Sequence, residues 1–388
     1  MRNEAYLNEL LQREVATGQV SGAQLCVLKN GKEIYRYYTG MADMEAGVPV
    51  KEDTIYRMYS MTKPVTAVAA MILYERGLLD LYAPVSQYLP AYRGQKVLTE
   101  QGLVDAEREV TIRDLMNMTA GIVYPDMWFA AGREMENYYQ KFEEARRVGK
   151  EMTTREFMDF IAGCPLEFQP GERWRYGACA DVMGAVIEII SGKKYSEFLQ
   201  EEIFTPLDMK DTAFYVPEEK WHRFAQGYEY NEAEQKLVPL AYNILALGDY
   251  RKPPAFESAG AGLVSTVEDY SHFALMLANG GEYNGVRMLG RKTVDFLATN
   301  QLTEAQLVSN DWESLRGYGY GNFMRTLLSR AKAASNGTEG EFGWDGWCGT
   351  YVAIDRAEDL VILYFIQRAG GGVASTVRKI RDIVYAGM

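Results

Sequence analysis

The sequence predicts an α/β (α+β) fold, with an antiparallel sheet flanked by helices and a mostly helical region inserted between the two halves of the sheet. Two segments, residues 23–40 and 349–368, each contain a pair of strand-like runs separated by a turn. Helical patterns occur at both ends of the chain, at residues 4–18 and 375–386. From about residue 64 to 250 the pattern is mostly helical. Hairpins and helices at both ends predict one sheet assembled from both termini.

The length of the chain indicates two structural units. A chain of 388 residues is longer than one small hydrophobic core usually serves. We expect a discontinuous sheet domain formed by residues 1–75 and 251–388, and a mostly helical domain formed by residues 76–250. The active site is expected at the interface of these two domains.

The strand predictions depend on turn chemistry and on residue type. In AQLCVLKNGKEIYRYYTG, the pair Asn30-Gly31 separates two runs rich in β-forming residues, which is a strong hairpin signal. In GTYVAIDRAEDLVILYFIQR, a second turn is expected from Asp355 to Asp359. Each segment is therefore predicted to be a hairpin.

The middle of the chain contains four predicted helices. Thr111 is the expected N-cap of one of them, and three of them are expected to end at glycine, namely at Gly77, Gly121 and Gly192. The four segments are residues 64–77, 111–121, 178–192 and 195–207. Residues 124–148 are rich in aromatic and charged side chains and have no clear period, so no element is assigned to them.

Charge and hydropathy argue against several classes of partner. The net charge of −12 argues against nucleic acid as the main partner and leaves no basic patch for a membrane surface. No apolar stretch approaches the length of about 18 to 20 residues that spans a bilayer. The first 15 residues have the pattern of an amphipathic helix and lack the features of a signal peptide, so a cytoplasmic location is expected.

Cysteines and histidines are few and scattered. No CxxC pair occurs, so neither a zinc site nor a disulfide framework is predicted. His272 lies in a helical pattern, where a structural role is favoured, and His222 has no motif around it. No GxSxG motif is present. The four cysteines are Cys26, Cys164, Cys179 and Cys348.

The stretch YSMTKPVTAVAAM pairs Ser60 with Lys63 at the head of an apolar helix. The SxxK pattern occurs twice more, but Ser191 lies at a predicted helix end and Ser329 lies in a polar, loop-bound segment. Residues i and i+3 share a helix face, so the Lys63 amine can reach the Ser60 hydroxyl. The helix N-terminus also supplies positive potential and free N–H groups where an oxyanion would form.

On this motif alone, two interpretations of Ser60 stay open. Ser60 is either a nucleophile activated by Lys63 or simply the N-cap of the helix. A serine hydroxyl is a weak nucleophile at neutral pH and needs an activating base. A partly desolvated lysine can be that base if its pKa falls. The catalytic interpretation therefore requires further partners.

Such partners are found in RWRYGACADVMG, where Tyr176 precedes a helix, and in FGWDGWCGTYVAID, where a glycine-rich turn starts a strand. With the segment from Ser60 to Lys63, they resemble the three signature elements of the class C β-lactamase-like serine hydrolases. That family includes serine esterases, penicillin-binding-protein-like members and D-amino-acid peptidases. The resemblance covers about residues 10–385 and implies a β-lactamase/transpeptidase-like fold. Other segments that carry it are TIRDLMNMTAGI, PLEFQPGERWRYG, FLQEEIFTPLDMKDTAFY and SAGAGLVSTVEDYSHFALML.

The resemblance implies a role for each matching residue. Ser60 is the implied nucleophile, and Lys63 is its base or the cation that tunes the base. Tyr176 takes the tyrosine position, where a phenolate stabilised by a nearby ammonium passes the proton to the leaving group. Whether Lys63 or Tyr176 accepts the Ser60 proton stays open. The backbone N–H groups of Ser60 and Trp347 are the implied oxyanion hole.

Two departures from the family motifs bear on the substrate. The family commonly has Tyr-x-Asn, but here the last position is Ala178, which offers no amide to an acylamino group. In place of Lys-Thr-Gly, this chain has Trp344-Asp345-Gly346, which lacks the cation that a β-lactam carboxylate needs. The tryptophan resembles the esterase branch, so a carboxylesterase acting on short-chain or small esters is predicted.

Three aromatic residues of IVYPDMWFAAG are candidate walls of the acyl pocket, with ordinary packing as the alternative: Tyr124, Trp128 and Phe129. Gly260 and Gly262 in SAGAGLVST are interpreted as glycines of a close-packed turn, with a structural role. The expected partner is a small-molecule ester or amide, processed through an acyl-enzyme, and this mechanism needs no metal or organic cofactor. The alternatives left open are a weak class C-type β-lactamase or D-amino-acid peptidase, and a penicillin-binding-like receptor without turnover.

Overall fold

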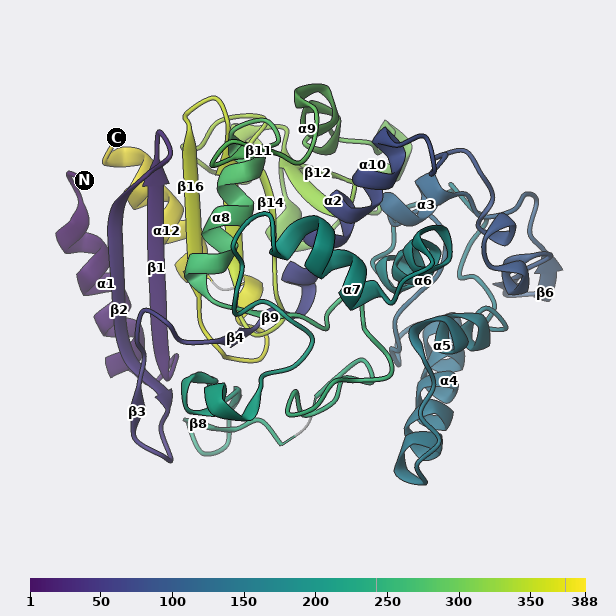
Figure 1. Cartoon of the computed structure of the whole chain (residues 1–388), viewed down its shortest axis with the longest axis horizontal. Helices are drawn as coiled ribbons and strands as arrows, with labels where there is room; N and C mark the ends of the chain where they lie inside the picture. The colour runs from purple at the N-terminus through teal and green to yellow at the C-terminus, as the bar shows by residue number, and fades with distance from the viewer. Residues whose placement is uncertain (242, 374) are drawn as a thin grey trace.

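The largest sheet of the structure has eight strands in the order β12-β13-β14-β15-β16-β1-β2-β3. The computed structural model describes residues 1–241, 243–373 and 375–388. Strand β1 pairs antiparallel with β16 on one side and β2 on the other, so both ends of the chain build one sheet (Figure 1). The strands are β1 (Gly22–Lys29), β2 (Lys32–Asp43), β3 (Val48–Pro49), β12 (Tyr318–Gly321), β13 (Met324–Leu327), β14 (Phe342–Asp345), β15 (Tyr351–Asp355) and β16 (Leu360–Phe365).

Both predicted hairpins are confirmed. Strands β1 and β2 are joined at Asn30 and Gly31, whose φ angles of 51° and 71° both lie in the left-handed region that such a two-residue turn requires. Strands β15 and β16 pair antiparallel from Asp355 opposite Leu360, which places their turn where the sequence predicts it. The antiparallel sheet expected from the two termini is therefore present.

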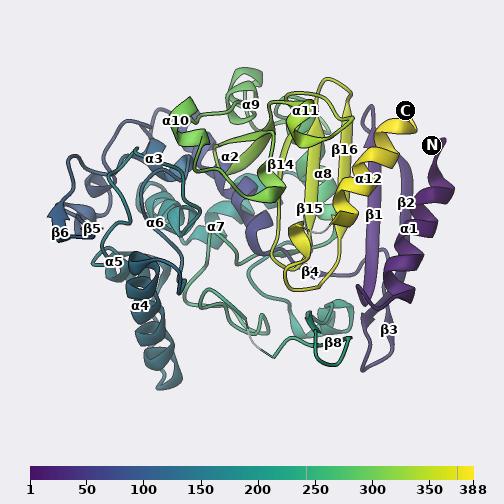
Figure 2. The same cartoon turned by 180° about the vertical axis from the view of Figure 1, so that it is seen from behind.

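The two faces of the sheet are covered by different helices. Successive side chains of a strand point to opposite faces, so Leu25 and Val27 join one buried cluster, and Cys26 and Leu28 join another. The first cluster includes residues of both terminal helices, which lie on the face of the sheet that is turned toward the viewer in Figure 2. The second includes residues of α2 and α8, and α8 lies in front of the sheet in Figure 1. These helices are α1 (Glu4–Ala16), α12 (Ser375–Ala386), α2 (Thr62–Glu75) and α8 (Val267–Ala278).

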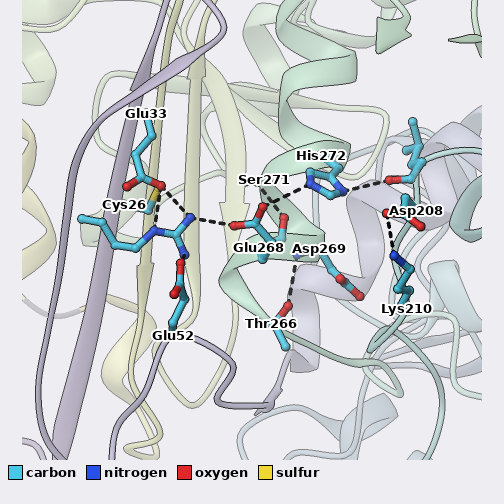
Figure 3. Close-up of polar contacts among 12 residues, drawn as sticks. Cys26, Glu33, Glu52, Asp208, Lys210, Thr266, Glu268, Asp269, Ser271 and His272 are labelled. Atoms are coloured by element: carbon cyan, nitrogen blue, oxygen red, sulfur yellow. Dashed lines mark hydrogen bonds and ion pairs between the residues drawn. The ribbon is translucent and has the colours of Figure 1, made fainter. Parts of the chain in front are cut away.

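A polar network joins α8 to strand β2 (Figure 3). Arg36 of β2 donates from Nε to Glu33 and from Nη2 to Glu268, each at 2.7 Å. His272 Nε2 lies 3.4 Å from a carboxylate oxygen of Glu268, and its Nδ1 lies 2.9 Å from the Leu207 carbonyl oxygen. The contact with Glu268 raises the pKa of His272. His272 therefore lies on a helix, as predicted, and its contacts are structural.

The four predicted helices of the middle region are confirmed, with shorter ends for some of them. Thr111 caps α3 as predicted, because its hydroxyl accepts from Asp114 N. Gly192 ends α6 in the left-handed conformation, with a φ of 69°. Helix α3 ends at Met116 instead of Gly121, since Met118 already has a φ of 57°. Besides α2, the helices are α3 (Ile112–Met116), α6 (Cys179–Ser191) and α7 (Tyr195–Leu199), which continues as a π-turn over Gln200–Phe204.

The assignment of no element to residues 124–148 is wrong. Most of this segment is α4 (Ala130–Arg147), which projects from the body of the molecule in Figure 1. The apolar residues of this helix do recur with a helical period, but they are few among many charged residues. The buried apolar residues are Ala131, Met135, Tyr139 and Phe142. The remaining helices are α5 (Thr154–Ile161), α9 (Arg291–Leu297), α10 (Glu304–Leu307) and α11 (Arg330–Ala333).

Four two-stranded pairs complete the described regular structure, namely β4 (Tyr56–Arg57) with β9 (Val264–Ser265), β5 (Lys96–Thr99) with β6 (Gly102–Asp105), β7 (Tyr228–Asn231) with β8 (Lys236–Pro239), and β10 (Glu282–Tyr283) with β11 (Val286–Arg287). Two of these pairs lie between residues 76 and 250, where helices dominate the prediction. The domain boundaries at residues 75 and 250 stay a prediction. Within the described ranges, no helix has the length and apolar character needed to cross a membrane.

Candidate active site

Ser60 lies in a strained turn that leads into α2. It belongs to a 3₁₀ turn, Tyr59–Met61, and the preceding Tyr59 has a φ of 43°, which costs a bulky residue about 1–3 kcal/mol. Tyr59 is fully buried, its ring packs edge-on against Trp347 at 5.2 Å, and its hydroxyl donates to Asn243 at 3.1 Å. These contacts hold a conformation that leaves Ser60 partly exposed.

The N-cap interpretation of Ser60 is wrong. The N-cap residue of α2 is Met61, and the Ser60 hydroxyl instead accepts a hydrogen bond from Lys63 Nζ at 3.3 Å. The other two SxxK serines have the structural roles expected of them. Ser191 bonds within the end of its own helix, and Ser329 caps α11 by accepting from the Lys332 backbone.

Lys63 is completely buried and holds a central place in the site. Its Nζ donates to Ser60 Oγ at 3.3 Å, to Tyr124 Oη at 3.2 Å and to the Gly260 carbonyl at 2.8 Å. Burial lowers the pKa of Lys63 from 10.5 to about 7, and the carboxylate of Asp181 is the largest opposing influence. Near neutral pH the amine is therefore partly uncharged, as a base next to a serine must be.

Asp181 is a site residue that the sequence argument missed. It lies in the first turn of α6 and is 1% exposed. Its carboxylate accepts from Tyr124 Oη at 3.1 Å, from Ser258 Oγ at 2.6 Å and from Gly260 N at 2.9 Å. An aspartate in the mostly apolar helix CADVMGAVIEII is a signal that could have identified it, since buried charges are normally paired.

Gly260 orients the lysine through its backbone. Its carbonyl accepts from Lys63, and its N–H donates to Asp181. A Cβ at this position would lie 2.5 Å from Tyr124 Oη and 2.7 Å from an Asp181 oxygen, so a side chain does not fit. Gly262 packs against Phe214 at similarly short range. Both glycines are structural, as interpreted, and Gly260 also contacts the lysine.

Tyr176 lies beside the lysine and next to the third motif. Lys63 Nζ is 4.5 Å from the centre of the Tyr176 ring, and Trp344 Nε1 donates to the Tyr176 hydroxyl at 3.1 Å. Burial raises the pKa of Tyr176 far above its ordinary value, against the hydrogen bonds from Ser60 and Trp344. This direction disfavours the phenolate expected from the resemblance. A neutral Tyr176 that accepts from Trp344 keeps its own proton to donate.

The turn after β14 lies against the backbone that precedes Ser60. A Cβ on Gly346 would collide with the Met58 carbonyl oxygen, and Thr350 Oγ1 donates to that same oxygen at 3.0 Å. Trp347 follows this turn and packs on Tyr59, the neighbour of Ser60. The structure therefore brings the two backbone segments of the expected oxyanion hole together.

Two of the residues predicted to bind substrate, Ala178 and Asp345, are either buried or directed toward another side chain. Ala178 is fully buried at the N-cap of α6. The carboxylate of Asp345 is turned toward Arg325, whose Nη1 lies 3.5 Å away. Burial raises the pKa of Asp345 to about 6, and Arg325 is the main opposing influence. The substrate-binding roles of Ala178, Asp345 and Gly346 stay predictions.

The aromatic candidates are divided between the site and the surface. Tyr124 is brought into the site by its bonds to Lys63 and Asp181. Trp128 is 86% exposed, and Phe129 packs its ring 4.2 Å from the Arg175 guanidinium carbon. The substrate-binding role of Trp128 stays a prediction.

Trp312 is an aromatic residue of the site that no sequence motif indicates. Its ring packs edge-on against Tyr176 at 5.1 Å and against Trp174 at 5.2 Å, and 37% of it is exposed. It lies in the polar segment SNDWESLRG, more than a hundred residues after Tyr176. Only the fold brings the two rings together.

Known proteins with similar sequences include members of one family and a named esterase. A family model described as Beta-lactamase matches residues 7–386. Protein Rv1367c of Mycobacterium tuberculosis (strain ATCC 25618 / H37Rv) is 32% identical over 374 residues, covering 93% of this chain and 89% of the relative. Esterase EstB of Burkholderia gladioli is 29% identical over 397 residues, covering 98% of this chain and 95% of the relative.

The fold is also found among solved structures. The structure of EstCE1, described as a hydrolase with promiscuous acyltransferase activity, matches with a TM-score of 0.83 at 23% identity and covers 98% of each chain. This similarity confirms the expected β-lactamase/transpeptidase-like fold. The family model covers nearly the whole chain, from the first helix to the last. The chain therefore belongs to the beta-lactamase family of serine hydrolases.

Proposed function

We propose that this protein is a carboxylesterase that hydrolyses small esters through an acyl-enzyme formed on Ser60. The observation that carries the proposal is the buried Lys63 amine, 3.3 Å from Ser60 Oγ and with a pKa lowered to about 7. Such an amine accepts a proton near neutral pH without a histidine. Lys63 is thus the general base in this proposal.

In the acylation step, neutral Lys63 takes the Ser60 proton as Oγ attacks the ester carbonyl carbon. The carbonyl oxygen becomes an oxyanion, which the N–H groups of Ser60 and Trp347 stabilise. When the tetrahedral intermediate collapses, the bond to the leaving alcohol breaks and the alkoxide takes a proton. Tyr176 is placed to donate it, since Trp344 already occupies its hydroxyl as a donor. The Lys63 ammonium returns a proton to Tyr176, which leaves the acyl-enzyme and a free alcohol.

In the deacylation step, water replaces the alcohol. Neutral Lys63 removes a water proton as the water oxygen attacks the acyl carbon. The Ser60 oxygen leaves and is reprotonated from the Lys63 ammonium, which restores the free enzyme and releases a carboxylic acid. Each proton taken by Lys63 is therefore returned within the same step.

Trp344 favours an ester over a β-lactam as the substrate. It is 2% exposed, its Nε1 is committed to Tyr176, and it carries no charge for a substrate carboxylate. The relative EstB is named an esterase, which agrees with this assignment. The cytoplasmic location and the class C assignment expected from the sequence stay predictions.

The proposal is tested by comparing p-nitrophenyl butyrate with a chromogenic cephalosporin as substrates of the wild-type enzyme. We expect a much larger kcat/KM for the ester. Faster turnover of the cephalosporin would favour a β-lactamase instead. Stoichiometric acylation by either compound without turnover would favour a receptor-like protein.

The Asp181→Asn variant is expected to shift the pH dependence of ester hydrolysis. The Asp181 carboxylate raises the pKa of Lys63, so the loss of this carboxylate lowers the pKa of Lys63 further. Because the neutral amine is the active form, the acidic limb of the kcat/KM profile moves to lower pH. The profile is measured between pH 5 and pH 9, and an unchanged limb in a folded variant would contradict Lys63 as the base.

The Trp312→Ala variant is expected to raise KM for esters with aromatic or bulky groups, with little change for acetate esters. The exposed part of Trp312, beside Tyr176, offers an apolar face to a substrate, and its loss is worth roughly three- to tenfold. A series of p-nitrophenyl and naphthyl esters measures this, with Trp312→Phe as the conservative control. Trp128→Ala belongs in the same series, and an unchanged chain-length preference would contradict the predicted role of Trp128.

A further inference from the structure

A polar cavity lies against α12, and its lining does not include Ser60, Lys63 or Tyr176. Its volume is about 220 Å³, smaller than the roughly 300–1,000 Å³ of sites for drug-sized ligands. Side chains from β12 to β15, from α11 and from α12 line it. Its size suits a small ion or metabolite.

Positive charge predominates in this cavity. Five cationic side chains line it, against three carboxylates, so the lining carries an excess of positive charge in a protein whose net charge is −12. The carboxylates are Glu313, Asp345 and Asp382. The cationic residues are Arg316, Arg325, Lys332, Arg378 and Arg381.

Arg325 is the buried floor of the cavity. Its side chain is 4% exposed, and its guanidinium carbon lies 4.6 Å from the centre of the Tyr351 ring. One end, Nη2, donates to the Val352 carbonyl at 3.0 Å. The other end, Nη1, is buried without a hydrogen-bond acceptor among the described residues, and Asp345 reaches it only at 3.5 Å. A buried N–H group without an acceptor is costly, and an oxygen of a bound anion would supply one.

The other cationic side chains differ in whether an acidic side chain already pairs with them. Arg381, 5% exposed, donates to the buried Glu341, yet its Nε has no acceptor among the described residues. Arg378 lies 3.8 Å from Glu313, too far for a hydrogen bond. Arg316 and Lys332 are exposed at the rim. Two buried guanidinium groups below, one of them paired with Glu341, and two exposed rim cations above form a site for negatively charged oxygens.

From these observations we infer that the cavity binds a small anion bearing phosphate or carboxylate groups, at a site separate from the catalytic one. Because Glu341 already pairs with Arg381, one cation remains in excess, which suits an anion, and planar guanidinium groups bind both kinds of oxygen in pairs. Two lining residues are chain neighbours of active-site aromatics: Asp345 follows Trp344, and Glu313 follows Trp312. The site thus lies directly behind the catalytic wall.

The test is isothermal titration of the full chain with sodium phosphate and, separately, with sodium succinate, at constant ionic strength. We expect one site for at least one of the two anions. The Arg316→Gln/Lys332→Gln double variant changes only rim residues and should fold normally. It should weaken binding at least about tenfold, the loss of one charge-assisted hydrogen bond.

Two controls separate this site from other causes of binding. Lys236→Gln removes one exposed positive charge from β8, outside the cavity, and should leave the affinity unchanged. Ser60→Ala should also bind normally, which separates this inference from the proposed esterase. No binding of either anion at millimolar concentration, or equal weakening by Lys236→Gln, would overturn the inference.

Discussion

Replacing Ser60 with alanine is expected to abolish ester hydrolysis. Removing the nucleophile of a serine hydrolase costs roughly a millionfold in kcat, so a loss of at least about 10⁴-fold is expected even with an activated ester. The Lys63 amine is directed at the Ser60 hydroxyl from a buried position, so the variant loses the group that this base activates. The rate of p-nitrophenyl butyrate hydrolysis by purified variant and wild type measures the loss.

Ser191→Ala is a matched control for this prediction. Ser191 is also the serine of an SxxK pattern, but it lies at the end of α6 and bonds to its own helix. Its replacement should leave kcat/KM within about twofold of the wild-type value, because Ser191 lies outside the active site and its loss disturbs no buried contact of that site. Residual activity of Ser60→Ala above a few per cent of wild type, or an equal loss in Ser191→Ala, would contradict the assignment of Ser60.

Lys63→Met is expected to give the second largest loss, about 10²- to 10⁴-fold in kcat, because it removes general base catalysis while filling the same space. The loss should persist at every pH. In the wild type, by contrast, kcat/KM should fall tenfold for each unit of pH below about 7, as Lys63 becomes protonated. Stopped assays of the variant and the wild type across this pH range measure both effects.

Thermal unfolding distinguishes a catalytic from a structural role of Lys63. A buried lysine is costly to keep, so an apolar replacement of similar volume is expected to leave the melting temperature unchanged or raised. A variant that is inactive because it unfolds would show a lower melting temperature instead. Full activity in a stable Lys63→Met variant would assign the base to another residue, with Tyr176 as the first candidate.

The sequence predicted most of the fold because its strongest signals are local. The Asn30-Gly31 turn, the Thr111 cap and the Gly192 stop each depend on backbone conformations that few residue types adopt. Helix α4 was missed because its apolar residues form a narrow stripe among many charged ones. A short period over so few positions is hard to distinguish from a polar loop.

The site residues that belong to the three sequence motifs were predicted from the sequence. Ser60, Lys63 and Tyr176 are brought together as the resemblance implies, and Trp344 contacts Tyr176. The expected phenolate could not be judged from sequence, because the pKa of Tyr176 depends on how deeply the fold buries it.

Residues outside the motifs required the structure. Asp181 acts through Tyr124 and Gly260, and Trp312 through its packing on Tyr176, so each is defined by contacts distant in sequence. The same holds for Arg325, whose unused N–H group is visible only once its neighbours are in place. Such residues carry no local signature, since any residue of suitable size and charge could satisfy the contact.

The most direct test of the account is to trap the acyl-enzyme position with a p-nitrophenyl phosphonate ester and locate the adduct by mass spectrometry. The account predicts one adduct per chain, on Ser60, the only serine of the tryptic peptide that spans residues 58–76. Labelling should be absent in Ser60→Ala and strongly slowed in Lys63→Met. An adduct on another residue, or undiminished labelling of Ser60→Ala, would contradict the claim that Ser60 is the nucleophile.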